Sequence, residues 1–345
     1  MRDRAACDFA RDHQQIVTGS SPMGAVRREL RTADGVRIEA GYEPYAGPAD
    51  GGRAAGTGAD PGAIVLAHGF TGALGRAPLR RAATAFTAHA AVVTFSFRGH
   101  GRSGGRSTVG DLEVLDLAAA VAWARSLGHR RVATVGFSMG GAVVLRHGAL
   151  HRAEHGDGHA SSTSDPVMHR GRTVARTADR GGAQGAGDSQ GDAYADAVVA
   201  VSAPARWYYR GTAPMRWLHW AIQHPVGRLF SRYGLRTRVH HRDWDPVPLS
   251  PIAAAPLIAP VPLLVVHGDQ DPFFPVDHPL ALAEAADPEA SELWLVPGFG
   301  HAENSADPAL LDRIGDWAAT RLQAPAARPH HGSRDKQDAT EGTDG

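Results

Sequence analysis

The sequence predicts an α/β protein with a mostly parallel central sheet and helices on both faces. Short apolar runs of strand length recur along the chain, and segments with helical periodicity separate several of them. The runs are apolar on both faces, as are the buried strands of a parallel sheet. Polar, glycine-rich turns follow these runs, at the strand ends where open α/β sheets bind ligands. Together these observations predict successive βαβ units.

Expected strands and helices follow one another along most of the chain. Residues 30–45 are expected to form a β-hairpin, because Asp34-Gly35 is a strong turn signal. A connection rich in Gly, Ala, Pro and Asp follows at 47–62. The expected strands cover residues 63–67, 91–97, 131–137, 197–203, 262–267 and 292–296. The expected helices cover residues 111–128, 139–151 and 307–324.

Composition divides the chain into parts of different character. Residues 152–193 contain hardly any large apolar side chain, so they cannot bury enough surface to offset the entropy of ordering. Residues 205–256 contain four of the seven tryptophans, a composition that can pack. The expected parts are a flexible leader (1–29), a first core segment (30–204) with a disordered insertion (152–193), a small aromatic-rich cap (205–256), a second core segment (257–324) and a disordered tail (325–345).

Bulk composition narrows the classes of function. The formal net charge is zero, which gives no general attraction to nucleic acid or to an anionic membrane. Lys336 is the one lysine among 36 cationic residues, a bias typical of a GC-rich genome. Cys7 is the single cysteine, so no intramolecular disulfide can form. The first 24 residues lack the apolar run of a secretory signal, and no stretch approaches the roughly 18 apolar residues of a membrane helix. We therefore expect a cytoplasmic protein with no transmembrane segment and no nucleic-acid partner.

Ser138 stands between an expected strand and an expected helix, with Gly136 and Gly140 two residues to either side. This G-x-S-x-G pattern fits a nucleophile elbow, a sharp turn that holds a serine hydroxyl above the end of the sheet. The alternative is an ordinary helix N-cap, which would not need the two glycines.

Partners for such a serine follow other expected strands. Asp269 and Asp271 lie in the turn after residues 262–267, and His301 lies in the glycine-rich loop after the last strand. The chain order serine, aspartate, histidine is the one found with G-x-S-x-G elbows. Residues alone leave the choice between the two aspartates open. Asp243 and Asp245 are further alternatives for the acid, and His267 and His278 for the base.

Five segments carry a resemblance to a known family: HGFTG (68–72), FRGHGRSGG (97–105), GFSMGG (136–141), HGDQDPFFP (267–275) and GFGHAE (298–303). With them the chain resembles serine hydrolases of the α/β-hydrolase fold, of the capped esterase and lysophospholipase-like (serine aminopeptidase-like) kind. The resemblance implies that Ser138 is the nucleophile, Asp271 the acid and His301 the base. It also implies that the backbone N–H groups of Phe70 and Met139 form the oxyanion hole, and that no cofactor is needed.

Two further features concern ligands. The cap tryptophans Trp207, Trp217 and Trp220 are candidates for an acyl pocket, although most tryptophans of a small subdomain serve its packing. Histidines recur at four-residue spacing from His147 to His159, as metal ligands on a helix could. Because glycines interrupt that helix, we expect no metal site.

The resulting hypothesis is an enzyme that cleaves carboxylic esters of small or medium acyl substrates through an acyl-enzyme. Its partners would be a small-molecule acyl substrate and water. Thioesterase, amidase or peptidase, and acyltransferase reactions use the same residues and stay open as alternatives. A binding protein on the same scaffold is the alternative from a different class.

Overall fold

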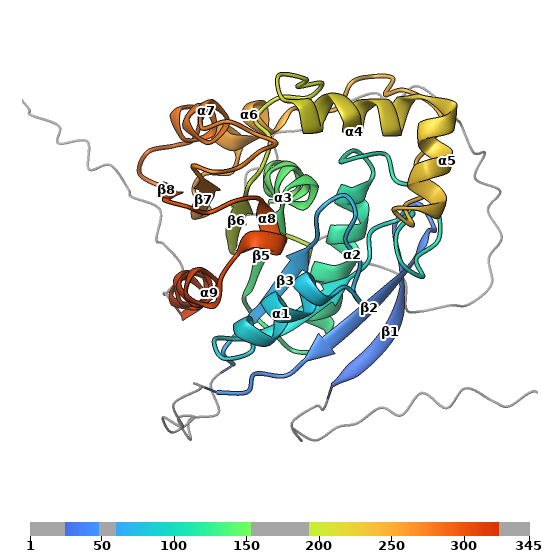
Figure 1. The fold of residues 1–345 in the computed structure, drawn as a ribbon. Coiled ribbons are helices and arrows are strands. Elements are labelled where there is room, and N and C mark those ends of the chain that lie inside the picture. The colour runs from blue at the N-terminus through green and yellow to red at the C-terminus, as the bar shows by residue number, and fades with distance from the viewer. Residues whose placement is uncertain (1–24, 48–59, 153–192, 324–345) are drawn as a thin grey trace, which may run out of the picture.

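The computed structural model describes residues 25–47, 60–152 and 193–323, and they form one eight-stranded sheet flanked by helices (Figure 1). The spatial order of the strands is β1-β2-β4-β3-β5-β6-β7-β8. Their bounds are β1 Val26–Arg31, β2 Arg37–Glu43, β3 Ala63–Ala67, β4 Ala91–Phe95, β5 Val132–Phe137, β6 Ala197–Val201, β7 Leu263–Gly268 and β8 Ser291–Val296. The six strands β3 to β8 are parallel, and the hairpin β1–β2 joins β4 antiparallel.

Burial explains why these strands could be seen in the sequence. Every residue of β3, β4, β5, β6 and β7 is buried, so each strand is a continuous apolar or small run. The fold class expected from the sequence is confirmed. The order of the strands reverses beside β3, because β4 lies on one side of it and β5 on the other. Such a switch point is where an open α/β sheet forms a ligand crevice.

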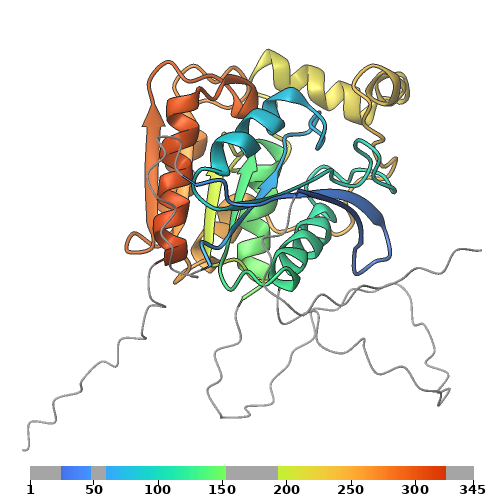
Figure 2. The same cartoon turned by 90° about the horizontal axis from the view of Figure 1, so that it is seen from below.

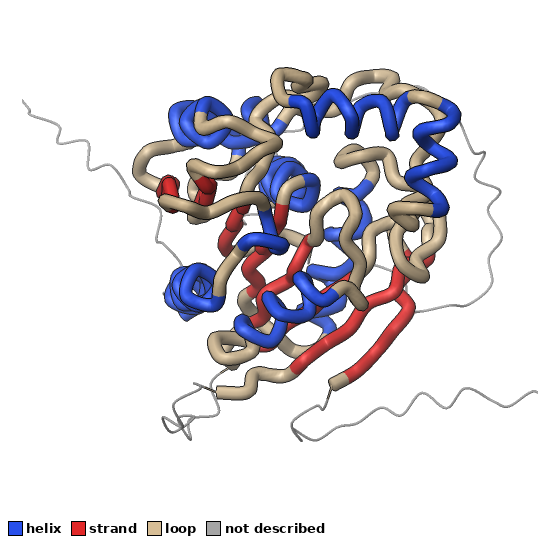
Figure 3. The backbone as a smooth tube through the Cα atoms, viewed as in Figure 1, coloured by secondary structure: helices blue, strands red, loops and turns tan. Residues whose placement is uncertain are grey.

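Helices cover both faces of the sheet (Figures 1 and 2). One face packs against α1 and α9, and the other against α2, α3 and α7. The helix bounds are α1 Ala77–Phe86, α2 Glu113–Ser126, α3 Met139–Leu150, α4 Ala213–Gln223, α5 Pro225–Tyr233, α6 Pro251–Ala254, α7 Asp277–Ala285, α8 Ala302–Ser305 and α9 Pro308–Gln323. Helices α4 and α5 pack on each other at one end of the sheet, and Leu218 and Ile222 of α4 contact the core (Figure 3). None of the helices in the described parts is long and apolar enough to cross a membrane.

The structure differs from the sequence expectations at the N-terminal end. Strand β1 begins at Val26, within the residues expected to be a flexible leader, and pairs in register with β2 from Val26↔Tyr42 to Arg31↔Arg37. The sequence did not predict the early part of β1, because this is an edge strand. Its residues 27–29 are exposed and show no alternation of apolar and polar side chains. Residues 1–24, most of the expected insertion (153–192) and the tail lie outside the described residues.

Candidate active site

Ser138 occupies a strained turn between β5 and α3. Its backbone has φ 53° and ψ −112°, and non-glycine residues seldom adopt a positive φ. The flanking glycines make the turn possible. A Cβ on Gly136 would lie 2.1 Å from the carbonyl oxygen of Gly140, and a Cβ on Gly140 would lie 2.2 Å from that of Ala67. The turn therefore requires glycine on both sides of the serine.

Ser138 begins a chain of hydrogen bonds through two other loops. Its Oγ–H donates to Nε2 of His301 over 2.9 Å, and Nδ1–H of His301 donates to Oδ2 of Asp271 over 2.7 Å. His301 lies between β8 and α8, and Asp271 lies in the turn after β7. Three strand ends thus bring together a hydroxyl, an imidazole and a carboxylate.

The surroundings of Asp271 favour its ionised form. Its side chain is fully buried, which raises the pKa of the carboxyl. The hydrogen bond and charge of His301 outweigh this effect, together with the N–H groups of Phe273 and Phe274, which donate to Oδ1 over 2.8 and 3.1 Å. The net result is a pKa of Asp271 below its ordinary value. Its carboxylate can therefore hold the imidazole in one tautomer.

The other acidic and histidine candidates make their hydrogen bonds elsewhere, although Nε2 of His267 lies 3.7 Å from Oδ2 of Asp271. Asp269 is exposed and accepts a hydrogen bond from the N–H of Gly298 over 2.7 Å. The two residues Asp243 and Asp245 are exposed on the connection after α5. His267 donates from Nε2 to the carbonyl of Phe274 over 2.8 Å, while Nδ1 of His278 accepts the N–H of Ala205 over 2.9 Å.

Phe70 and Met139, the two expected oxyanion donors, lie beside the serine. Met139 is the first residue of α3, whose initial N–H groups have no acceptor within the helix. Phe70 follows β3 and lines the same cavity as Ser138. Its loop is held on both sides, because His100 donates from Nε2 to the carbonyl of Phe70 and the N–H of Gly69 donates to Oε1 of Glu303 over 2.9 Å.

Glu303 was not singled out from the sequence, although it closes the GFGHAE segment. It is nearly completely buried, and burial raises the pKa of its carboxyl. Its contact with Gly69 connects the loop that carries His301 to the loop that carries Phe70. Its position two residues after His301 was the one sequence feature that could have indicated a role for Glu303. The hydrogen bond to the N–H of Gly69 becomes visible only in the folded structure.

A cavity of about 590 Å³ opens onto Ser138 and His301. This volume lies within the range typical of small-molecule sites. One wall comes from α4 and another from the turn after β7, and both are largely apolar. The apolar side chains of the lining are those of Phe70, Pro214, Met215, Trp217, Leu218, Leu235, Pro272, Phe273, Phe274 and Ala302. Such a lining suits an acyl chain better than a polar group.

Of the three tryptophans expected at an acyl pocket, Trp217 lines this cavity and the other two do not. Trp207 donates from Nε1 to the carbonyl of Pro248 over 3.0 Å and packs on Trp244. Trp220 is 43% exposed and stacks on His224. Neither residue therefore borders the cavity, a property that aromatic content alone could not reveal.

The histidine series does not form a metal site in the described part of the chain. The rings of His147 and His151 stack with their centroids 4.6 Å apart. Among the described residues there is no group of three or more potential ligands. The remaining members, His155 and His159, lie outside the described residues.

Comparisons with known proteins agree with this architecture. A family model described as the alpha/beta hydrolase fold matches residues 62–304. The chain therefore belongs to the α/β-hydrolase fold family, and it is a hydrolase. A monoacylglycerol lipase of Mycolicibacterium smegmatis is 29% identical over 280 residues, which cover 76% of this chain and 90% of that protein.

Solved structures share the fold at low sequence identity. The Pyrococcus furiosus esterase Pf2001 superposes with a TM-score of 0.56 at 18% identity, covering 89% of this chain and 96% of that one. The α/β hydrolase GrgF from Penicillium sp. sh18 gives a TM-score of 0.56 at 17% identity, covering 87% of this chain and 99% of that one.

Proposed function

We propose that this hydrolase is a serine esterase that cleaves carboxylic esters through an acyl-enzyme. The observation that carries the proposal is the hydrogen-bonded chain from Ser138 through His301 to Asp271, whose serine end opens onto a largely apolar cavity. A serine hydroxyl alone is a weak nucleophile, and an imidazole held by a buried carboxylate is the arrangement that activates it. The similarity to a monoacylglycerol lipase supports an acyl ester as the substrate.

The mechanism follows from these groups. Nε2 of His301 accepts the proton of Ser138 as Oγ attacks the ester carbonyl, and Asp271 stabilises the imidazolium that forms. The N–H groups of Phe70 and Met139 donate to the oxyanion of the tetrahedral intermediate. Each such donor contributes about 3 kcal/mol to lowering the barrier. The imidazolium then protonates the leaving alcohol, and water activated by His301 releases the acid from Ser138.

We also propose that residues 205–256 act as a cap that completes the acyl-binding cavity. The support is that α4 supplies Pro214, Met215, Trp217 and Leu218 to the wall opposite the loop after β3. Helix α4 packs mainly against α5 rather than against the two helical layers of the core.

Replacement of the nucleophile tests the proposal. Ser138→Ala should lower kcat for p-nitrophenyl butyrate by at least about 10⁴-fold, because the acyl-enzyme can no longer form. Wild-type protein should be labelled at Ser138 by a fluorophosphonate probe, located by peptide mapping. Ser126→Ala is the control, since that serine bonds the carbonyl of Trp123 on α2. Turnover by Ser138→Ala at the wild-type rate, or labelling at a different serine, would reject the assignment.

A further inference from the structure

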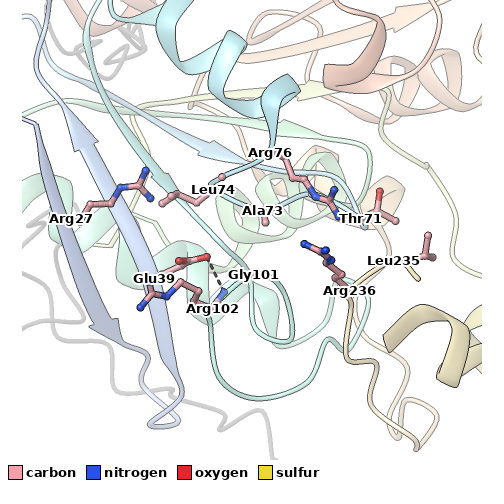
Figure 4. A pocket seen from close by; sticks show the side chains of 12 residues that line it. Arg27, Glu39, Thr71, Ala73, Leu74, Arg76, Gly101, Arg102, Leu235 and Arg236 are labelled. Atoms are coloured by element: carbon pink, nitrogen blue, oxygen red, sulfur yellow. Dashed lines mark hydrogen bonds between the residues drawn. The ribbon is translucent and has the colours of Figure 1, made fainter. Parts of the chain in front are cut away.

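A second cavity of about 460 Å³ lies next to the proposed active site and is rich in arginine (Figure 4). Its four guanidinium groups come from separate parts of the chain. Arg27 lies on β1, Arg76 precedes α1, Arg102 lies in the turn after β4, and Arg236 lies after α5. We call these four residues the arginine cluster. In Figure 4 the side chains of Arg76 and Arg236 lie near each other, and Arg27 and Arg102 lie on the other side of the cavity. The fold thus places four residues from distant segments around one cavity, and the high arginine content of the chain does not by itself produce this.

The positive charge of the arginine cluster is only partly balanced by nearby carboxylates of the described residues. Among the described residues that line this cavity, Glu39 is the one acidic residue. Its Oε1 already accepts hydrogen bonds from the Ser96 hydroxyl over 2.7 Å and from the Arg102 backbone N–H over 2.9 Å. None of the ion pairs between described residues involves a guanidinium of the cluster. A chain with zero formal net charge thus has a concentrated positive cavity.

The two cavities adjoin. Thr71 and Leu235 line both of them. The loop after β3 runs from Phe70, beside Ser138, to Arg76 in the cluster, and Leu235 is followed directly by Arg236. Thr71 and Leu235 therefore form the border between the cavity at Ser138 and the cavity that contains these two arginines.

We propose that the arginine cluster binds an oxyanion on the alcohol portion of the substrate, while the acyl chain occupies the apolar cavity. The proposal rests on the esterase function above and adds the substrate class: esters whose alcohol carries a phosphate or a carboxylate. Guanidinium groups match these oxyanions because each presents a planar pair of donors. One exposed ion pair contributes little, so several arginines around one cavity are needed for a useful preference.

The test compares three esters with the same acyl chain. Octanoyl glycerol, octanoyl glycerol 3-phosphate and octanoyl glycerate carry a hydroxyl, a phosphate and a carboxylate on otherwise similar alcohols. Release of octanoate by the full-length protein gives kcat/KM for each. We expect an anionic ester to be preferred over the neutral one, and the preference to decrease between 0.01 and 0.3 M salt, since screening weakens exposed charge interactions. The phosphate and carboxylate esters distinguish which oxyanion is recognised.

Two double variants show whether the cluster is responsible. In Arg76→Gln/Arg236→Gln, the ratio of kcat/KM for the preferred anionic ester to that for octanoyl glycerol should fall about tenfold, as expected for losing two ion pairs. The control Arg31→Gln/Arg130→Gln removes the same charge at exposed arginines outside both cavities, and it should keep the wild-type ratio.

The outcomes separate this proposal from the esterase function. Equal turnover of neutral and anionic esters, or a ratio that falls equally in both double variants, would overturn the oxyanion site while leaving the esterase intact. Turnover of all three esters by Ser138→Ala at the wild-type rate would overturn the esterase itself. Retention of the wild-type ratio in the Arg76→Gln/Arg236→Gln variant would also reject the cluster.

Discussion

Asp269 and Asp271 are two residues apart in one turn, yet their environments differ completely. Asp271 is buried, accepts two backbone N–H groups and meets His301. Asp269 is exposed and accepts a hydrogen bond from the N–H of Gly298 in the loop after β8. A two-residue step in a turn is enough to direct one carboxylate into the site and the other to the surface.

The difference between the two carboxylates can be tested by replacing each of them. Asp271→Asn should lower kcat for p-nitrophenyl butyrate by about 10⁴-fold, because the amide no longer holds the imidazole in the tautomer that accepts the serine proton. Asp269→Asn is the matched control and should reduce kcat by less than about tenfold, since it affects one loop contact. Steady-state kinetics on both variants checks the prediction, and a larger loss from Asp269→Asn would move the acid to that position.

At the scale of elements, the site depends on how closely α3 approaches β3 and β5. Gly140 has no room for a side chain, because the carbonyl of Ala67 at the end of β3 occupies that space. Gly141 is also close to a neighbour, Ala203 after β6. The strand-to-helix turn is therefore compressed against two neighbouring strands. Such packing holds Ser138 in its positive-φ conformation.

Gly140→Ala should destabilise the protein by about 3 kcal/mol, because the new Cβ must displace backbone. Gly75→Ala is the control. It adds the same methyl group where nothing lies within 4 Å, and it should change the free energy of unfolding by less than about 1 kcal/mol. Urea denaturation followed by circular dichroism measures both. Equal stability of the two variants would show that the turn relaxes without strain.

At the scale of the whole molecule, burial keeps several histidines neutral. Burial lowers the pKa of His68 to about 3, with a smaller contribution from His100. Burial, together with Arg206 and His267, lowers the pKa of His278 to about 4. The unfolded chain binds protons at these residues near pH 6.5, whereas the folded chain does not until lower pH. Between these values the unfolded state holds more protons, so the free energy of unfolding should decrease as the pH falls.

His278→Gln isolates one of these groups. The variant should lose stability between pH 6.5 and 4 less steeply than the wild type, by up to about 1.4 kcal/mol per pH unit, because one titrating group is absent. The difference between the two proteins should be constant above pH 7.5, where the histidine is neutral in both states. Chemical denaturation across this pH range tests the prediction. Parallel curves from pH 7.5 to 4 would mean that His278 is protonated equally in the folded and unfolded states.

The sequence was most informative where a structural signal is local. The buried strands β3 to β7 follow their apolar runs closely, and the glycines around Ser138 mark the turn that the structure contains. The sequence predicted edge strand β1 only in part, since its exposed residues at 27–29 do not form an apolar run. Helix α1 was not among the expected helices, although its buried residues form an apolar face at helical spacing.

The sequence by itself determined the fold class and the kinds of residue that follow each strand, because apolar periodicity and tight turns depend on neighbours along the chain. The tertiary structure decided which of these residues meet. It brought Asp271 rather than Asp269 to His301, turned Trp217 but not Trp207 or Trp220 toward the cavity, and placed Glu303 against Gly69. It also gathered the arginine cluster from four segments. These contacts join residues far apart in the chain, and their geometry depends on how the sheet and helices pack.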